Sequence, residues 1–433
     1  MSEWKETTLG NLINIKHGWA FKGEFFNETN QPQNIVVAIG NFNYSGGFRF
    51  DSTRTKEYLD SYPKEYELIP GDILLAMTCQ TAGGEILGIP GRIPTDNNTY
   101  LHNQRLGKVE IKDEEITDPS FIYWLCLWQN FNHHLVATAT GTKILHTAPE
   151  RIKSFVFECP PIDKQKQIGK TLDALDRKIS NLRKQNETLE AIAQTLFKHW
   201  FVDFEFSNED GKPYKSSGGE MVRSELGEIP VGWLVGTLGD VTVTITKGTT
   251  PTTFKKQFQD SGINFVKAES ITDDRSMDSS RFAYIDEETN QLFKRSILQA
   301  KDLVYTIAGT IGRYAMVNES ILPANTNQAV AIIRPDIEKV DPEYLLCYFS
   351  SKSYQHYLSS RVVQAVQANL SLGILSESPI VLPDKNIKMK FGRLAKAIFQ
   401  KKEENQKQIQ TLTKTRDVLL PKLMSGKLRI TTS

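Results

Sequence analysis

The most regular hydrophobic pattern of the chain occurs twice, once near its middle and once near its end. In both stretches the pattern recurs in steps of three and four, which is the spacing of a coiled-coil seam. The first seam is Ile168, Leu172, Leu175, Ile179, Leu182, Asn186, Leu189, Ala193, Leu196 and Trp200. The second seam is Phe391, Ala395, Ile398, Lys402, Asn405, Ile409, Leu412, Arg416, Leu419 and Leu423. A helix lying on its own domain could show one such stripe, but two of about 35 residues favour a pair of helices that pack on each other.

Polar residues interrupt both seams. They are Asn186 in the first and Lys402, Asn405 and Arg416 in the second. Burying such groups between two helices costs free energy unless they find partners. We therefore expect Lys402, Asn405 and Arg416 either to fix the register of the pair or to leave a face for another protein.

The segments around the seams show that the chain is a tandem duplication. "WKETTLGNL" at Trp4 returns as "WLVGTLGDV" at Trp233, and "TDPSFIYWL" returns as "VDPEYLLCY". Pro160 matches Pro383, so the offset drifts only from about 229 to about 223 residues, as in one long repeat rather than a short-period array. The predicted organisation is a globular copy 1–163, a helix 164–200, a connection 201–228, a second copy 229–386, a helix 387–424 and a tail 425–433.

The junction "LFKHWFVDFEF" joins the first helix to the connection. Trp200, Val202, Phe204 and Phe206 alternate with polar residues, which is the period of an extended segment. The connection that follows is polar and rich in Gly, Ser and Pro. We expect the aromatic side of the junction to pack on the end of the helix.

Composition narrows the class of protein. The 433 residues are enough for two or three domains, and the net charge of +1 gives no support to nucleic-acid binding by itself. The two helical stretches are basic, however, so the remainder of the chain is acidic. There is no apolar run of membrane-spanning length, and "MSEWKETTLG" is not a signal peptide. Four dispersed cysteines without a CxxC pair argue against a zinc site and a disulfide framework, and they fit a cytoplasmic protein.

Motifs that could carry catalysis are better explained structurally. "DPSF" and "DPEY" resemble the DPPY loop of adenine methyltransferases only weakly, and predict helix starts with Asp118 and Asp341 as N-caps. "TAGGEILGIPG" is glycine-rich but is not a P-loop. Adjacent His133 and His134 cannot face one metal from a helix, and no HExxH or GxSxG is present. The sequence predicts no catalytic residues and no metal site.

The remaining candidates are polar side chains that recur at equivalent places in both copies. Asn and Gln can pair with adenine edges, Arg with guanine, and Lys or Thr with phosphates. In the first copy the candidates are Lys16, His17, Lys22, Thr78, Gln80, Thr81, Asn103, Gln104, Arg105, Thr142 and Lys143. In the second copy they are Lys247, Lys255, Lys256, Thr310, Arg313, Asn327, Gln328, Gln364, Gln367 and Asn369.

The chain resembles the specificity subunits of type I restriction–modification systems. The resemblance is carried by "LGNLINIKHGWAFKG", "PGDIL", "CPPIDKQKQIGKTLDALDRKI", "LFKHWFVDFEF", "LGEIPVGW" and "LLPKLMSGKL", in this order along the whole chain. Lys164 stands where the family usually has Glu, and "LPDKNIKMKFGRL" has lost most of the corresponding motif of the second copy.

The resemblance implies an α+β fold, in which two α/β-type target-recognition domains are related by a pseudo-two-fold and separated by an antiparallel two-helix coiled coil. Each domain would read one half of a split, asymmetric DNA target. It also implies that two modification subunits and the restriction and translocase subunits are partners, with S-adenosylmethionine and ATP/Mg on those subunits and no cofactor on this chain.

Two other classes of protein stay open at the sequence level. The chain could be a coiled-coil adaptor that binds only proteins, or an enzyme with an unrecognised site. Cofactor binding by the isolated chain would identify an enzyme. Sequence-specific DNA binding together with the modification subunit would exclude a pure adaptor.

Overall fold

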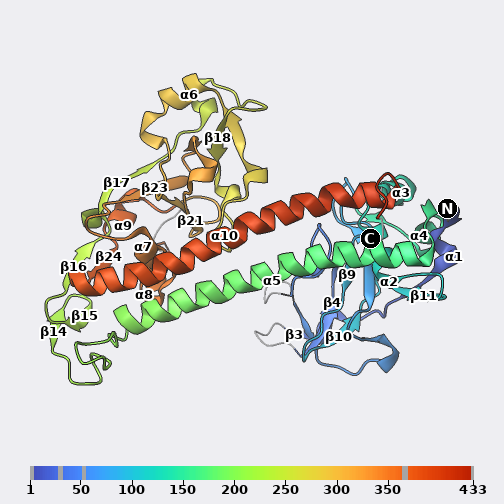
Figure 1. Ribbon diagram of the computed structural model, residues 1–433, viewed down its shortest axis with the longest axis horizontal. Helices are drawn as coiled ribbons and strands as arrows, with labels where there is room; N and C mark the ends of the chain where they lie inside the picture. Colours follow the sequence, from blue (N-terminus) through green and yellow to red (C-terminus); the bar gives the residue numbers. More distant parts are fainter. Residues whose placement is uncertain (1–3, 28–32, 51–54, 363–368, 431–433) are drawn as a thin grey trace. The chain divides into compact units, whose positions relative to one another are not determined.

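The computed structural model describes residues 4–27, 33–50, 55–362 and 369–430. The chain divides into two compact units, residues 1–181 with 408–433, and residues 182–407. Each unit holds one globular copy together with part of α5 (Ile162–Phe201) and part of α10 (Lys385–Met424) (Figure 1). These two helices correspond to the predicted stretches 164–200 and 387–424.

The first copy combines two sheets with short helices. One antiparallel sheet has the order β2 (Ile13–His17), β11 (Leu106–Ile111), β7 (Ile73–Ala76) and β9 (Pro90–Arg92). The other has the order β3 (Phe26–Asn27), β5 (Glu57–Tyr58), β4 (Asn34–Val37), β10 (Thr99–His102) and β6 (Glu67–Leu68), with β4 and β10 parallel. Two small sheets pair β1 (Lys5–Thr8) with β13 (Val156–Cys159), and β8 (Thr78–Cys79) with β12 (Leu145–His146). The helices are α1 (Leu9–Leu12), α2 (Pro119–Cys126), α3 (Gln129–Thr138) and α4 (Pro149–Lys153).

The second copy repeats this plan. Its antiparallel sheet has the order β17 (Thr242–Lys247), β23 (Val330–Pro335), β20 (Leu303–Thr306) and β21 (Tyr314–Met316). Its other sheet has the order β19 (Ala283–Ile285), β18 (Ile263–Val266) and β22 (Ala324–Thr326), with β18 and β22 parallel. β16 (Leu234–Thr237) pairs with β24 (Pro379–Leu382), as β1 pairs with β13. The helices are α6 (Glu287–Leu292), α7 (Pro342–Ser350), α8 (Lys352–Val362) and α9 (Leu372–Ser376). The predicted duplication and α+β class are therefore confirmed.

The two long helices run antiparallel within each unit. In the first unit the Arg416 guanidinium of α10 lies 2.9 Å from Asp176 Oδ1 of α5. In the second unit, Phe197 near the end of α5 packs on Phe391 near the start of α10, with ring centroids 6.0 Å apart. The start of α5 thus lies beside the end of α10, and the end of α5 lies beside the start of α10, as in the predicted antiparallel pair.

The apolar seam positions face the interior. The fully buried ones are Ile168, Leu172, Ile179, Leu182, Ala193, Phe391, Ala395, Ile409 and Leu423. The half-buried ones are Leu175, Leu189, Leu196, Trp200, Ile398, Leu412 and Leu419. Ile168, Leu172 and Leu423 join the core of the first copy, while Ala193 and Phe391 join that of the second, so the helices are part of both cores. In the described part of the chain no helix is long and apolar enough to span a membrane.

The start of each long helix is stabilised differently. In the first copy the buried side chain of Gln165 donates to the carbonyls of Ile116 and Pro160, and accepts from the Asp118 amide. Lys164, the departure from the family pattern, donates to Gln167 Oε1 and to the Ile430 carbonyl at 3.0 and 2.9 Å. In the second copy Asp384 accepts from the first amides of α10. In the second copy, which has lost the motif that contains Gln165 in the first, a capping carboxylate thus stabilises the start of the helix.

The two predicted N-caps differ. The Asp118 carboxylate accepts from the Phe121 amide at 2.8 Å, with Pro119 at the first helical position of α2, which confirms the prediction. Asp341 precedes Pro342 and α7 in the same way, but its side chain makes no capping bond. The predicted helix start at Asp341 is therefore confirmed, while the capping hydrogen bond of its side chain is absent.

The junction after α5 also departs from the prediction. Helix α5 continues to Phe201, so Trp200 belongs to the helix and not to the extended segment that the alternating pattern predicted. Val202 is exposed, whereas Phe201, Phe204 and Phe206 are buried and contact Trp233. Phe204 has a φ of 59°, and this left-handed residue directs the chain away from the helix. A hairpin of β14 (Met221–Ser224) and β15 (Gly227–Pro230) then leads into the second copy.

Candidate nucleic-acid interface

Four segments of the first copy, far apart in the sequence, are joined by backbone hydrogen bonds. The Trp19 amide donates to the His102 carbonyl at 2.8 Å, and the Gln104 amide donates to the Trp19 carbonyl at 2.9 Å. The Met77 amide donates to the Arg105 carbonyl at 3.1 Å, and the Met77 carbonyl accepts from Thr147 at 3.0 Å. Segments 16–22, 77–81, 103–105 and 140–147 therefore form one surface, which we call loop cluster 1.

The second copy builds the same surface from equivalent segments. The Thr249 amide donates to the Thr326 carbonyl at 3.2 Å, as Trp19 does to His102. The Ile307 amide donates to the Ala329 carbonyl at 2.8 Å, and the Ile307 carbonyl accepts from Leu370 at 2.9 Å. Segments 247–250, 307–313, 326–329 and 369–370 form loop cluster 2.

A glycine makes the central crossing possible in each cluster. A Cβ on Gly18 would lie 2.3 Å from the Asn103 carbonyl carbon, and one on Gly248 would lie 1.9 Å from the Thr326 carbonyl oxygen. Both distances are far below a van der Waals contact, so only glycine fits. Sequence analysis did not single out these glycines. The signal was their equivalent place in "KHGW" and "TKGT".

Most of the candidate side chains reach the surface. In the first copy the exposed ones are His17, Lys22, Gln80, Thr81, Gln104, Arg105, Thr142 and Lys143. In the second copy they are Lys247, Lys255, Thr310, Gln328 and Asn369. Lys16, Asn103, Lys256, Arg313 and Asn327 are half-buried. Gln364 and Gln367 lie outside the described residues.

Several candidates are occupied by bonds within the chain. Thr78 is only 5% exposed, and its hydroxyl lies 3.1 Å from His146 Nδ1, so it supports the cluster from below. The Lys16 ammonium stands 5.2 Å from the Tyr66 ring centre and 3.7 Å from the Glu65 carboxylate. Lys256 binds Glu288 of α6 at 2.7 Å, which directs it away from loop cluster 2. Lys255 lies outside the segments that define loop cluster 2, whereas Lys22 is the last residue of segment 16–22.

Buried His102 belongs to the base of loop cluster 1. Its Nε2 donates to the Leu106 carbonyl at 2.9 Å. Burial lowers the pKa of His102 from 6.5 to about 4, and the nearby Lys108 and Lys16 ammonium groups act in the same direction. His102 is therefore neutral near pH 7 and holds the loop rather than carrying a charge to the surface.

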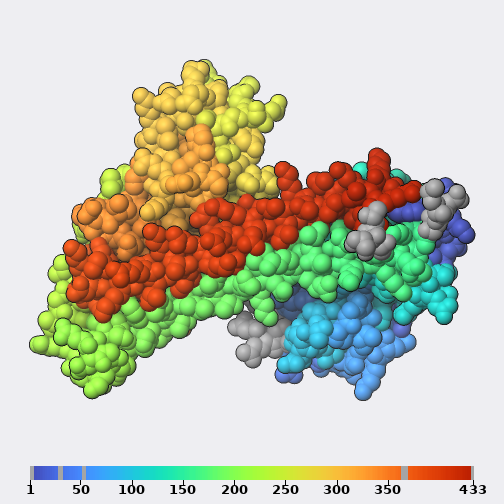
Figure 2. Space-filling view, in the orientation of Figure 1, coloured from blue at the N-terminus to red at the C-terminus, as the bar shows by residue number. Residues whose placement is uncertain are grey.

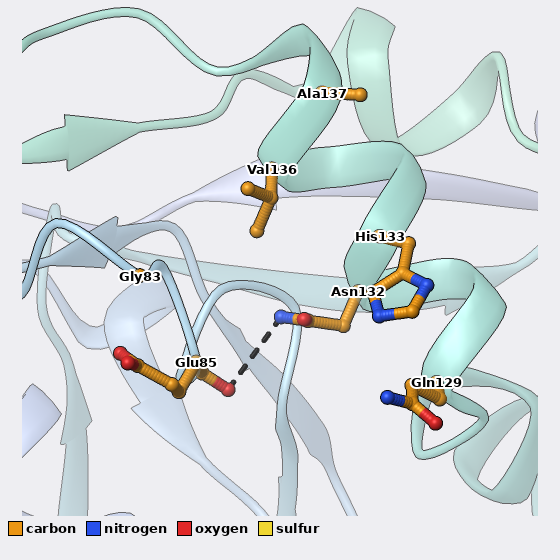
Figure 3. A pocket seen from close by; sticks show the side chains of 7 residues that line it. All are labelled: Gly83, Glu85, Gln129, Asn132, His133, Val136 and Ala137. Carbon is orange, nitrogen blue, oxygen red and sulfur yellow. Dashed lines mark hydrogen bonds between the residues drawn. The ribbon is translucent and has the colours of Figure 1, made fainter.

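An open hollow of about 510 Å³ lies between α3 and the loop 83–85 (Figure 3). Asn132 from α3 faces that loop, and its amide donates to the carbonyls of Gly84 and Leu87 at 3.0 and 2.9 Å. The Glu85 carboxylate accepts from the Thr81 hydroxyl, a bond that lowers the pKa of Glu85. These polar groups hold the loop in place. Among the described residues no three His, Cys, Asp or Glu side chains gather closely enough to hold a metal ion.

The fold and these surfaces define a class of protein: a duplicated recognition protein, whose two α+β copies present equivalent loop clusters and share an antiparallel pair of long helices. Comparison with known proteins identifies the family. The model of the type I restriction modification DNA specificity domain matches residues 1–191 and 230–414, once for each copy. The chain therefore belongs to the type I restriction–modification DNA specificity family, whose members are specificity subunits and not the catalytic chains of their systems. The resemblance predicted from the sequence is confirmed.

Known specificity subunits align with this chain over most of its length. The MjaIX specificity subunit of Methanocaldococcus jannaschii is 28% identical over 346 residues, covering 78% of this chain and 76% of the relative. The HindI specificity subunit of Haemophilus influenzae is 23% identical and covers 99% of this chain and all of its own. Among solved structures, a type I S subunit from M. genitalium superposes with a TM-score of 0.58 at 15% identity, covering 99% of this chain and 97% of that chain.

Proposed function

We propose that this chain gives a type I restriction–modification complex its DNA sequence specificity, with each copy reading one half of a split target. The observation that supports this proposal is that four equivalent segments converge in both copies, through three equivalent backbone hydrogen bonds, while their side chains differ. A backbone frame shared by the two copies, with different polar side chains on each, fits two readers of different short sequences. The two half-sites should therefore differ, and the target should not be a palindrome.

The side chains on the two clusters suit contacts with a DNA duplex. Loop cluster 1 exposes Gln80, Gln104 and Arg105, which have the donors and acceptors that pair with adenine and guanine edges in the major groove. Loop cluster 2 exposes Thr310, Gln328 and Asn369, and its arginine, Arg313, is held by Asp273. Lys143 and Lys247 are placed to contact phosphates and to contribute affinity without sequence preference.

The partners follow from the proposed role. Double-stranded DNA is the ligand, a pair of modification subunits would bind to the helices, and restriction and translocase subunits would complete the assembly in the cytoplasm. S-adenosylmethionine and ATP/Mg would be used by those partner subunits, and this chain would hold no cofactor. Because the two copies should be related by a pseudo-two-fold, the methylated adenines should lie on opposite strands.

Sequencing of genomic DNA for N6-methyladenine tests this proposal. Cells that carry the gene should methylate one split motif at nearly every occurrence, and cells lacking the gene should leave that motif unmodified. A second comparison restores the gene with Gly248→Val. The added side chain should prevent the close approach of residue 248 to the Thr326 carbonyl in loop cluster 2 and abolish methylation. An identical methylation pattern with and without the gene would refute the proposal.

A further inference from the structure

Two asparagines form a buried polar layer between the long helices. Asn186 of α5 is 8% exposed and Asn405 of α10 is 1% exposed. Asn405 Nδ2 donates to Asn186 Oδ1 at 3.0 Å, and Asn186 Nδ2 donates to the Lys402 carbonyl at 3.4 Å. Among the described residues Asn405 Oδ1 finds no partner, and an unpartnered buried oxygen costs about 1–3 kcal/mol. Two leucines would avoid that cost, so stability alone does not account for the pair.

One turn further along α5, a single carboxylate receives two cations. Glu190 Oε2 lies 2.6 Å from the Lys402 ammonium of α10, and Glu190 Oε1 binds the Arg275 guanidinium of the second copy. All three side chains are less than a quarter exposed. Burial alone would raise the pKa of Glu190, but Lys402 and Arg275 hold it below its usual value. Glu190 is therefore charged at neutral pH and joins both long helices to the second copy.

The loop that carries Arg275 reaches loop cluster 2. The Lys402 ammonium donates to the Asp274 carbonyl at 3.1 Å, and the Arg275 guanidinium stands 5.3 Å from the Tyr314 ring centre. The next acidic residue, Asp273, binds Arg313 through two bonds of 2.7 and 3.0 Å. In Figure 2 the second copy, in yellow and orange, rests directly on the part of α10 that belongs to its unit. A continuous set of contacts thus links the helix pair to a candidate base-reading arginine.

We propose that a group of five residues determines specificity by fixing two things: the register of α5 against α10, and the position of the second copy on these two helices. The five residues are Asn186, Glu190, Arg275, Lys402 and Asn405. We call these five residues the register cluster. The inference rests on the proposed function, because what the register sets is the number of unread base pairs between the half-sites. The cluster touches no base and acts through position.

Physical reasons favour register over stability as the role of this cluster. An apolar seam is nearly as stable after a slip of one heptad, whereas a buried amide pair is satisfied in one alignment only. Breaking one partner of a buried ion pair leaves an uncompensated charge, so a slip that separates Glu190 from Lys402 is strongly disfavoured. A slip of one heptad moves a helix by about 10 Å, which is about three base pairs of B-DNA.

The first copy is attached to α5 through another carboxylate. Asp173 accepts from Arg92, Ser120 and Trp124 at 2.9, 2.7 and 2.7 Å. The Arg92 guanidinium lies 4.1 Å from the Tyr123 ring centre, so each copy attaches to α5 by an arginine that also covers a tyrosine. Asp173 does not contact α10 through any of these bonds. In these contacts Glu190 and Lys402 each join the second copy and both helices.

The test uses the whole chain assembled with its modification subunits, and DNA that carries both half-sites separated by gaps of different length. Wild-type complex should methylate one gap strongly. Asn186→Leu/Asn405→Leu, Glu190→Gln and Arg275→Met should each lose about tenfold of the discrimination against gaps about three base pairs longer or shorter, the change that a slip of one heptad gives. The half-site sequences should stay the same, and Arg275→Lys, which keeps the charge, should remain closer to wild type. Lys401→Met is the matched control, because Lys401 is exposed beside Lys402 and pairs only at the surface with Glu404.

The outcomes separate the two proposals. A wild-type complex without sequence-specific methylation contradicts the proposed function itself. A gap-specific wild type, with the three cluster variants as selective as Lys401→Met, contradicts the register inference alone. Thermal unfolding checks the fold of each variant: the double leucine variant should be at least as stable as wild type, so it decides the question if a charge variant fails to fold.

Discussion

Exchanging residues 1–163 for the corresponding region of another family member is expected to change one half of the DNA target and to leave the other half unchanged. Loop cluster 1 lies entirely within this region, and loop cluster 2 lies entirely outside it. Since each mismatched base pair costs about 1–3 kcal/mol, a half-site with three changed pairs should be methylated on the order of a thousandfold less than before. Sequencing of methylated DNA from cells with the exchanged chain measures both halves at once.

The structure specifies which contacts the exchanged region must keep. The core of the first copy includes Ile168 and Leu172 of α5 and Leu423 of α10. Asp173 also needs its partners Arg92 and Trp124, so these two should be restored in the donor sequence if absent. The reciprocal control exchanges residues 229–386, which should change only the other half. A change in both halves after either exchange would show that the copies do not read independently.

Adding one heptad to both long helices together is expected to lengthen the unread gap by about three base pairs while both half-sites remain the same. At 1.5 Å per residue each 40-residue helix spans about 60 Å, longer than the roughly 35 Å of one DNA turn. Suitable places are between Asn181 and Leu182 in α5, and between Gln410 and Thr411 in α10. Both lie between the Asp176–Arg416 and the Asn186–Asn405 contacts.

The insertion in a single helix is the control. It would separate one polar layer from its partners and should impair assembly rather than give a new gap. The gap is read from the methylated motif in genomic DNA. If the matched insertion left the gap as it was, spacing would have to come from the partner subunits and not from these helices.

The sequence predicted the two helices and their antiparallel pairing, but not which seam residues lie opposite each other. Comparison of the repeats aligned Asn186 with Ile409, because it matches positions that are equivalent in the two copies. In the structure Asn186 lies opposite Asn405, because an antiparallel pair joins residues whose numbers run in opposite directions. The polar seam residues of α10 could be identified as exceptions from the sequence. Their partners Glu190 and Asp176 could not, since acidic residues on a basic helix look like ordinary surface positions.

The loop clusters show a similar division. Recurring polar segments could be found from the duplication alone, and the structure brings most of them together. Burial of Thr78 and the bond between Lys256 and Glu288 depend on neighbours more than thirty residues away, so local sequence gives no indication of them. Local sequence also gives no indication that Arg313 is paired, because its partner Asp273 lies in a distant loop, next to the residues that contact α5 and α10.

Site-specific photo-crosslinking to DNA tests the central claim most directly. A benzophenone amino acid replaces Gln104 in one chain and Gln328 in another, which are equivalent, exposed positions of the two loop clusters. Each complex is irradiated on a duplex that carries the methylated motif, and the crosslinked bases are mapped. We predict that position 104 crosslinks to one half-site and position 328 to the other. Crosslinks from both positions to the same half-site, or none from either, would contradict the account.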